Sequence, residues 1–216
     1  MLEIVWEGLR LYPADAPVYI RPMYWGIDFQ ACSGSSPQRR RPASRSASKR
    51  SRLRPRTPPP QLTRTRFRRP VLEDAVVNAK AGCLYPNNAR MIAEAKSKGY
   101  GNALVADALG NVAESASANV FMVKDGVVFT PIANGTFLSG ITRARHIANA
   151  RAAGFEVQET VLSFADFETA DEVFLSGNMH KVTPVTAFDG TRYEHGPVTR
   201  RVRDLYWDWA HSAAAR

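Results

Sequence analysis

The chain has 216 residues, of which 44% are hydrophobic, and this is enough for one substantial core or two small ones. No apolar stretch approaches the roughly 20 residues that a bilayer requires, which argues against a membrane protein. The first residues lack the pattern of a secretion signal, and the two cysteines, Cys32 and Cys83, predict neither a disulfide framework nor a zinc site. We therefore expect a cytoplasmic protein that binds no metal ion.

The formal net charge of +9 is concentrated in one segment. Residues 31–70 hold 12 Arg, one Lys and no acidic residue, which leaves 16 basic against 20 acidic residues elsewhere. From about residue 28 to 66 the chain is rich in Arg, Ser, Pro and Thr and poor in aliphatic residues, so it cannot offset the entropy of ordering and we expect disorder.

Two interpretations of this basic segment are open. It is either an arm that binds nucleic acid through its arginines, or an unselected insert translated from another reading frame. Phe29 is the one aromatic residue there, so a set of aromatic residues that would stack on bases is lacking, and no recognised nucleic-acid-binding fold surrounds the segment. The second interpretation is favoured, so a nucleic-acid partner is not expected.

The remaining patterns predict an α+β protein. Apolar residues within positions 4–11 indicate the last turns of an amphipathic helix, and the β-branched and aromatic run 18–25 predicts a strand. Ordered patterning returns near Phe67, where Val76-Val77 predicts a strand that leads into Lys80. Strands are further predicted over 103–107, 120–123, 127–130, 156–162, 172–175 and 182–187, and helices over 87–98, 142–153 and 196–213. Asp125-Gly126 predicts a tight hairpin turn.

Lys80 differs in context from the other five lysines of the chain. Those five, Lys49, Lys96, Lys98, Lys124 and Lys181, lie in polar, basic, turn or helix-surface sequence. Lys80 lies among small and apolar residues at the predicted strand end, where burial would lower its pKa and free the amine for Schiff-base chemistry. On this local pattern alone, a lysine that extends from a strand edge into solvent is the favoured alternative.

The wider pattern of motifs resembles one family. Lys80-Ala81-Gly82 followed by Tyr85 resembles the lysine segment of branched-chain amino acid aminotransferases, which are pyridoxal-phosphate enzymes of fold type IV. The stretch from Glu114 to Phe121 is similar to the family's element of Glu, four-residue gap, Asn, apolar residue and Phe. Further matches follow in order at residues 129–131, 138–143, 170–177 and 183–185, so that the resemblance covers about residues 67–211.

The resemblance implies a domain organisation. Residues 67–216 would form the cofactor-binding large domain of fold type IV, an α+β domain with mixed sheets or a barrel-like core and flanking helices. Residues 1–27 would be a remnant of the small N-terminal domain. The Arg/Ser/Pro-rich segment 28–66 would separate the two.

The resemblance also implies roles at the cofactor. Lys80 would hold pyridoxal 5′-phosphate covalently and then move a proton at the substrate's α-carbon. Glu114 would face the pyridine nitrogen, and Tyr85 would hydrogen-bond the phenolic oxygen. Ile141 and Thr142, opening a helix, would bind the phosphate. Taken singly, Glu114 could be a solvated turn carboxylate, Tyr85 a core residue and Thr142 a capping residue.

Substrate contacts are implied at two places. The turn Gly177-Asn178-Met179 corresponds to the family turn that receives the substrate carboxylate, and Asn178 stands where many relatives have a phosphate-binding Thr. Tyr19 and Arg21 resemble residues of the family's small-domain strand, where the Arg helps to bind a side-chain carboxylate such as that of glutamate.

The function so implied is transfer of the amino group of Leu, Ile or Val to 2-oxoglutarate, by a homodimer. Tyr19, Arg21 and the Lys80 motif favour this over the D-amino acid aminotransferases and aminodeoxychorismate lyases that share the fold. The remaining alternative is a non-enzymatic protein that binds nucleic acid through its basic segment.

Overall fold

The computed structural model describes residues 2–13, 18–25, 43–50, 59–179 and 181–212, and for 18–25 and 43–50 it describes the backbone alone. The chain forms two compact units, Met1–Thr57 and Pro58–Arg216. Within the described part of the chain, no helix combines the length and apolar character needed to cross a bilayer.

The first unit consists of one helix and one antiparallel strand pair. Its elements are α1 (Leu2–Leu9), β1 (Val18–Trp25) and β2 (Ala43–Arg50). The predicted helix and the strand over 18–25 are therefore confirmed. Strand β2 lies inside the segment expected to be disordered, and its pairing along the whole of β1 provides partners for its backbone groups. Residues 26–42 and 51–58, which make up most of that segment, lie outside the described residues.

The second unit begins earlier than the expected residue 67. Strand β3 runs over Gln61–Arg68, and Leu62 is fully buried in it. The alternation explains why a stretch so rich in arginine forms a strand: Thr63 and Thr65 point into the protein whereas Arg64 and Arg66 are exposed. The boundary at residues 66 and 67 is thus corrected, because it divides one strand.

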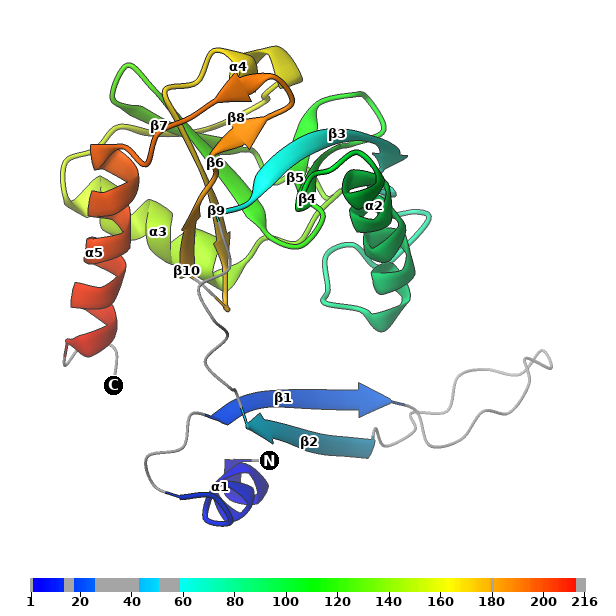
Figure 1. The fold of residues 1–216 in the computed structure, drawn as a ribbon. Coiled ribbons are helices and arrows are strands. Elements are labelled where there is room, and N and C mark those ends of the chain that lie inside the picture. Colours follow the sequence, from blue (N-terminus) through cyan, green and yellow to red (C-terminus); the bar gives the residue numbers. More distant parts are fainter. Residues whose placement is uncertain (1, 14–17, 26–42, 51–58, 180, 213–216) are drawn as a thin grey trace. The chain divides into compact units, whose positions relative to one another are not determined.

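Two mixed five-stranded sheets form the centre of this unit (Figure 1). The first has the order β12 (Thr191–Arg192), β11 (Ala187–Phe188), β3, β4 (Asn102–Ala106) and β5 (Val112–Ser115). The second has the order β10 (Lys181–Pro184), β9 (Glu172–Gly177), β6 (Asn119–Lys124), β7 (Val127–Pro131) and β8 (Val157–Thr160). Strands β11, β3 and β4 are parallel, as are β7 and β8, and the other pairs are antiparallel.

Helices cover the outer face of each sheet, and the two inner faces share one core. Helix α2 (Tyr85–Ser97), which follows the short helix η1 (Gly82–Leu84), packs on the first sheet through Met91 and Ala95. Helices α3 (Ile141–Ala152) and α5 (Pro197–His211) pack on the second sheet, and α4 (Phe164–Glu168) lies at the shared core. The shared core includes Leu62, Leu104, Val120, Met122, Phe167, Val173, Leu175 and Phe188. The helix–sheet–sheet–helix arrangement that results is an α+β domain.

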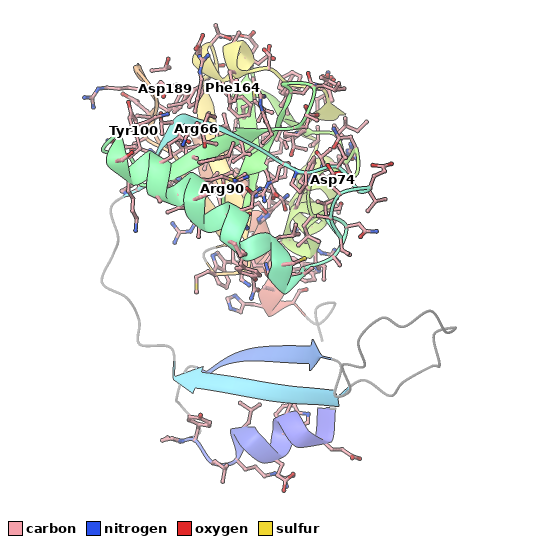
Figure 2. The ribbon with its side chains drawn as sticks, turned by 90° about the vertical axis from the view of Figure 1, so that its right-hand side faces the viewer. Arg66, Asp74, Arg90, Tyr100, Phe164 and Asp189 are labelled. Carbon is pink, nitrogen blue, oxygen red and sulfur yellow. The ribbon has the colours of Figure 1, made fainter. Side chains whose placement is uncertain are left out.

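The segment between β3 and α2 differs from the prediction. Val76 and Val77 do not form a strand, because this segment folds as successive turns, with the Asp74 amide bonded to the Val71 carbonyl and the Ala79 amide to that of Val76. Only Val77 is buried there. Figure 2 shows Asp74 of this segment at one end of α2, with Tyr100 and Asp189 at the other.

The predicted hairpin is confirmed between β6 and β7. Asp125 and Gly126 both have positive φ, 49° and 79°, as a two-residue type I′ turn requires.

Glu172 in β9 caps helix α5 from another element. The helix begins after Gly196 without a side-chain cap of its own, and the Glu172 carboxylate accepts the backbone N–H groups of Val198 (3.1 Å) and Thr199 (2.7 Å). Because Glu172 is buried, these bonds form where water cannot replace them.

We expect Glu172→Ala to lower the free energy of unfolding by about 1–3 kcal/mol, since it leaves buried donors without an acceptor. Urea denaturation followed by circular dichroism measures this change. The matched control is Glu194→Ala, because Glu194 is exposed just before the same helix. Equal stabilities of the two variants would contradict the capping role.

Candidate functional site

Glu114 and Asn119 lie where the chain crosses from the first sheet to the second. Glu114 is near the end of β5 and Asn119 begins β6, and between them the Ser115 amide and hydroxyl both donate to the Ala118 carbonyl (2.9 and 2.8 Å). Asn119 Nδ2 donates to Glu114 Oε2 (3.3 Å) and to the Leu138 carbonyl (2.9 Å). The tight turn thus places polar groups of both sheets at one edge of the shared core.

The Glu114 carboxylate is buried beside a buried arginine. Its side chain is only 10% exposed, and Arg69, which is 6% exposed, approaches Glu114 Oε1 to 2.9 Å. Burial raises the pKa of Glu114 to about 7, while the positive charges of Arg69 and Lys80 act against this rise. Whether Glu114 is ionised near pH 7 therefore depends on the opposing effects of its burial and of the charges of Arg69 and Lys80.

Lys80 is exposed, in agreement with the interpretation favoured on the local pattern alone, although turns and not a strand lead into it. The turns between β3 and α2 place only Val77 in the core and leave Lys80 outside it. Lys80 is nevertheless near enough to Glu114 for its charge to favour the ionised carboxylate. Tyr85 is the first residue of α2 and is partly exposed at 39%.

The N-terminus of α3 meets the same edge through Gly140. This residue precedes the helix without a side-chain cap, Ile141 is exposed and Thr142 is half-buried. A Cβ at Gly140 would lie 2.3 Å from Asn119 Oδ1, so only glycine allows this close approach. By contrast, the N-terminus of α4 is capped by side chains, because Ser163 and Asp166 form a capping box there.

The β9–β10 turn lies beside these groups. Ser176 pairs with Asn119 across the second sheet, and a Cβ at Gly177 would lie 3.4 Å from that of Ala118. Asn178 and Met179 follow in the turn, and both are exposed. The Asn178 amide oxygen accepts a hydrogen bond from Lys181 Nζ (2.9 Å), so this side chain is held by its own turn.

His146, in α3, contacts the same turn from the protein interior. The Nε2 atom of His146 lies 3.2 Å from the carbonyl oxygen of Lys181. The backbone of Lys181 is in the left-handed region, with a φ of 58°. Burial lowers the pKa of His146 to about 4, so the ring is neutral at pH 7. The start of α3 and the β9–β10 turn are in this way connected through one helix.

Tyr19 and Arg21 belong to β1 of the first unit, and their side chains lie outside the described residues. In the second unit, Asn119 and its neighbours connect the other predicted site residues. Asn119 donates to Glu114, and it lies against Gly140, which precedes Ile141 and Thr142. Asn119 also pairs with Ser176, which precedes Gly177, Asn178 and Met179. Lys80 joins them through its charge interaction with Glu114. Within the described residues, no group of three or more His, Cys, Asp and Glu side chains could hold a metal ion.

Three groups of the site were not given a role from the sequence. Arg69 lies just after the basic segment, and in sequence only its place directly before Pro70 distinguishes it from the arginines that precede it. Asn119 was recognised only as a position in a motif, and Asn88 carried no signal. Contact between residues so far apart in sequence could not be inferred from spacing.

The model of the amino-transferase class IV family matches residues 1–188. The chain belongs to this family, and the second unit has the α+β fold of its fold type IV structures. A solved aminotransferase from Brucella abortus, bound to the co-factor PLP, superimposes with a TM-score of 0.90 at 51% identity, covering 97% of this chain and 74% of the other. The branched-chain amino acid aminotransferase of Escherichia coli gives a TM-score of 0.80 at 26% identity, over 96% and 77% of the two chains.

Curated relatives are similar over part of the chain. A branched-chain-amino-acid aminotransferase of Escherichia coli K12 is 41% identical over 132 residues, which is 60% of this chain and 43% of the relative. That of Pseudomonas aeruginosa is 34% identical over 145 residues, 66% of this chain and 47% of the relative. The matches therefore span about half the length of these relatives.

The raised pKa of Glu114 predicts a pH-dependent stability. Because the folded pKa, about 7, lies above the ordinary value of 4.5, the folded state binds this proton more tightly than the unfolded state. The contribution is fully present below pH 4.5 and is lost as the pH rises through 7, a change on the order of 3 kcal/mol. We expect Glu114→Gln to lack this loss. Urea titrations at pH 4.5 and 8 on both proteins test it, and identical pH dependence would contradict it.

We expect Gly140→Ala to displace Asn119 and to destabilise the protein by about 1–3 kcal/mol through overpacking. Thermal unfolding measures the effect. Gly190→Ala serves as the control, since a Cβ at Gly190 meets nothing within 4 Å. A loss of stability no larger than that of Gly190→Ala would show that the close approach of α3 to Asn119 does not require glycine at residue 140.

Proposed function

We propose that this chain supplies the cofactor-binding part of a branched-chain amino acid aminotransferase that uses pyridoxal 5′-phosphate. The observation that carries the proposal is that the charge of an accessible amine, Lys80, acts on a buried carboxylate, Glu114, which Asn119 connects to the start of α3. The names of the Escherichia coli and Pseudomonas aeruginosa relatives support the substrate class, and the Brucella abortus structure supports the cofactor.

The residues present fit this cofactor in three respects. A buried carboxylate suits a protonated ring nitrogen, because such a pair needs no water. The start of α3 has no side-chain cap and meets Asn119 through a glycine, which leaves its first N–H groups for a phosphate. Lys80 is accessible enough to bond covalently to an aldehyde.

When bound, pyridoxal phosphate supplies a ring that withdraws electrons from the substrate's α-carbon. Lys80 would hold the cofactor and then, once the substrate amine has displaced it, remove the α-proton and return it to the cofactor carbon. Glu114 would keep the ring nitrogen protonated, and Tyr85 would donate to the phenolic oxygen. The N–H groups of Ile141 and Thr142, with the Thr142 hydroxyl, would hold the phosphate.

The β9–β10 turn would receive the substrate. Backbone amides of Gly177, Asn178 and Met179 would bind its carboxylate, and Tyr19 and Arg21 of the first unit would contribute to the recognition of glutamate. The Asn178 side chain, held by Lys181, would offer an amide near the phosphate in place of a hydroxyl. The amino group of Leu, Ile or Val would thereby pass to 2-oxoglutarate in two half-reactions.

The decisive test is the absorbance spectrum of the chain incubated with pyridoxal phosphate. We expect a visible band from covalently attached cofactor, which changes on addition of L-leucine, and its loss in Lys80→Ala. The rate of the amino acid half-reaction should fall at least about 100-fold in this variant. Lys96→Ala, on the exposed face of α2, is the control and should behave like the wild type. A covalent band that persists in Lys80→Ala would overturn the assignment.

A requirement for an acceptor separates transamination from a lyase of the same fold. We expect product from L-leucine to form catalytically only when 2-oxoglutarate is present, whereas a lyase would release product from one substrate. The homodimer and the cytoplasmic location expected from the sequence remain part of this proposal, and sedimentation of the purified chain tests the former.

A further inference from the structure

The Arg69 guanidinium contacts the site through both of its terminal nitrogens, whereas its buried Nε has no hydrogen-bond partner among the described residues. Its Nη2 lies 2.9 Å from Glu114 Oε1 and donates to the Ser115 carbonyl (3.1 Å), and its Nη1 donates to Asn88 Oδ1 (2.6 Å). These three acceptors belong to β5 and to the first turns of α2. One guanidinium therefore joins the strand that carries Glu114 to the helix that begins at Tyr85.

The backbone of Arg69 is fixed as well. Its amide donates to the Ala106 carbonyl (2.9 Å), which continues the pairing of β3 with β4 past the last residue of the strand. The planar guanidinium fork then has little freedom to move, because its base and both of its terminal nitrogens are held. A guanidinium held in this way can fix the positions of its partners Glu114, Ser115 and Asn88 relative to one another.

Glu114 is held at both carboxylate oxygens. Arg69 contacts Oε1, and Asn119 Nδ2 donates to Oε2 at 3.3 Å. Two charged groups act on this carboxylate: Arg69 by direct contact, and Lys80, from the segment before α2, by its charge. Burial alone would favour the neutral acid, which has no negative charge to stabilise a protonated ring nitrogen.

We propose that Arg69 is a positioning residue, which favours the ionised form of Glu114, orients this carboxylate for the ring nitrogen of the cofactor and fixes its distance from the helix of Tyr85. The orientation toward the cofactor rests on the proposed function, whereas the effect of Arg69 on Glu114 is a property of the protein alone. The two parts can therefore be tested separately.

The first test needs no cofactor. A carbon-13 NMR titration of the Glu114 carboxyl in the cofactor-free protein should show a pKa higher by about 1–3 units in Arg69→Met, because an adjacent opposite charge is removed. Arg69→Lys retains a positive charge and should show a smaller rise. Arg66→Met is the matched control, since it removes an exposed charge from strand β3, which directly precedes Arg69, and should leave the pKa of Glu114 unchanged. Equal values in Arg69→Met and the control would overturn the proposal.

The second test measures the affinity for pyridoxal phosphate in a double-mutant cycle. Arg69→Met should weaken binding about 10-fold or more in the wild-type background, which corresponds to the loss of a buried charged hydrogen bond, and should have no further effect in Glu114→Gln. Arg69→Lys should also weaken binding, because a single ammonium cannot replace the contacts to Glu114, Ser115 and Asn88 together.

The outcomes distinguish the two hypotheses. Equal weakening by Arg69→Met in both backgrounds would mean that Arg69 does not act through Glu114, and would overturn the positioning role. If the wild type attaches no cofactor at Lys80, the proposed function fails, and the NMR titration still decides whether Arg69 controls Glu114. If Arg69→Met does not fold, which circular dichroism reveals, both measurements are made on Arg69→Lys, and wild-type values for that variant would overturn the proposal.

Discussion

The two sheets of the second unit share one apolar interior, and this constraint determines where polar chemistry can occur. Leu62 and Leu104 of the first sheet and Val120 and Leu175 of the second meet there, so no charge can lie between the sheets without a large desolvation cost. The chain must nevertheless cross from one sheet to the other. It does so through the short turn after Ser115, and the polar residues on either side of this turn are placed at the rim of the core.

Buried charges at this rim have partners, although the partner Glu159 of Arg143 is itself partly exposed. Glu114 is paired with Arg69, and Arg143 of α3 donates to the carbonyl of Pro131 and to Glu159. Removing one member of such a pair leaves an uncompensated buried charge, which costs more than the pair itself contributes. The same arrangement that stabilises the rim therefore determines the ionisation of Glu114, on which the proposed transamination depends.

Elements with local signals were predicted well. The hairpin at Asp125-Gly126 follows from the backbone conformation of two residues, and α2, α3 and α5 follow from their glycine boundaries and apolar periodicity. Strand β3 was not predicted, because its buried positions include Thr63 and Thr65 and its exposed positions carry arginine, so composition obscured the alternation. Helix α4 was also missed, although Ser163 and Asp166 form a capping box that the sequence contains.

The sequence by itself determined the family to which the chain belongs, since motifs in a fixed order need no knowledge of distances. It also determined the α+β class and the residue types proposed to act, Lys80 and Glu114. Tertiary structure alone decided that Lys80 is exposed, that Arg69 contacts Glu114 and Asn88, and that Gly140 lies against Asn119. These facts depend on contacts between elements distant in sequence, and the burial and charge of a side chain arise only when such elements pack together.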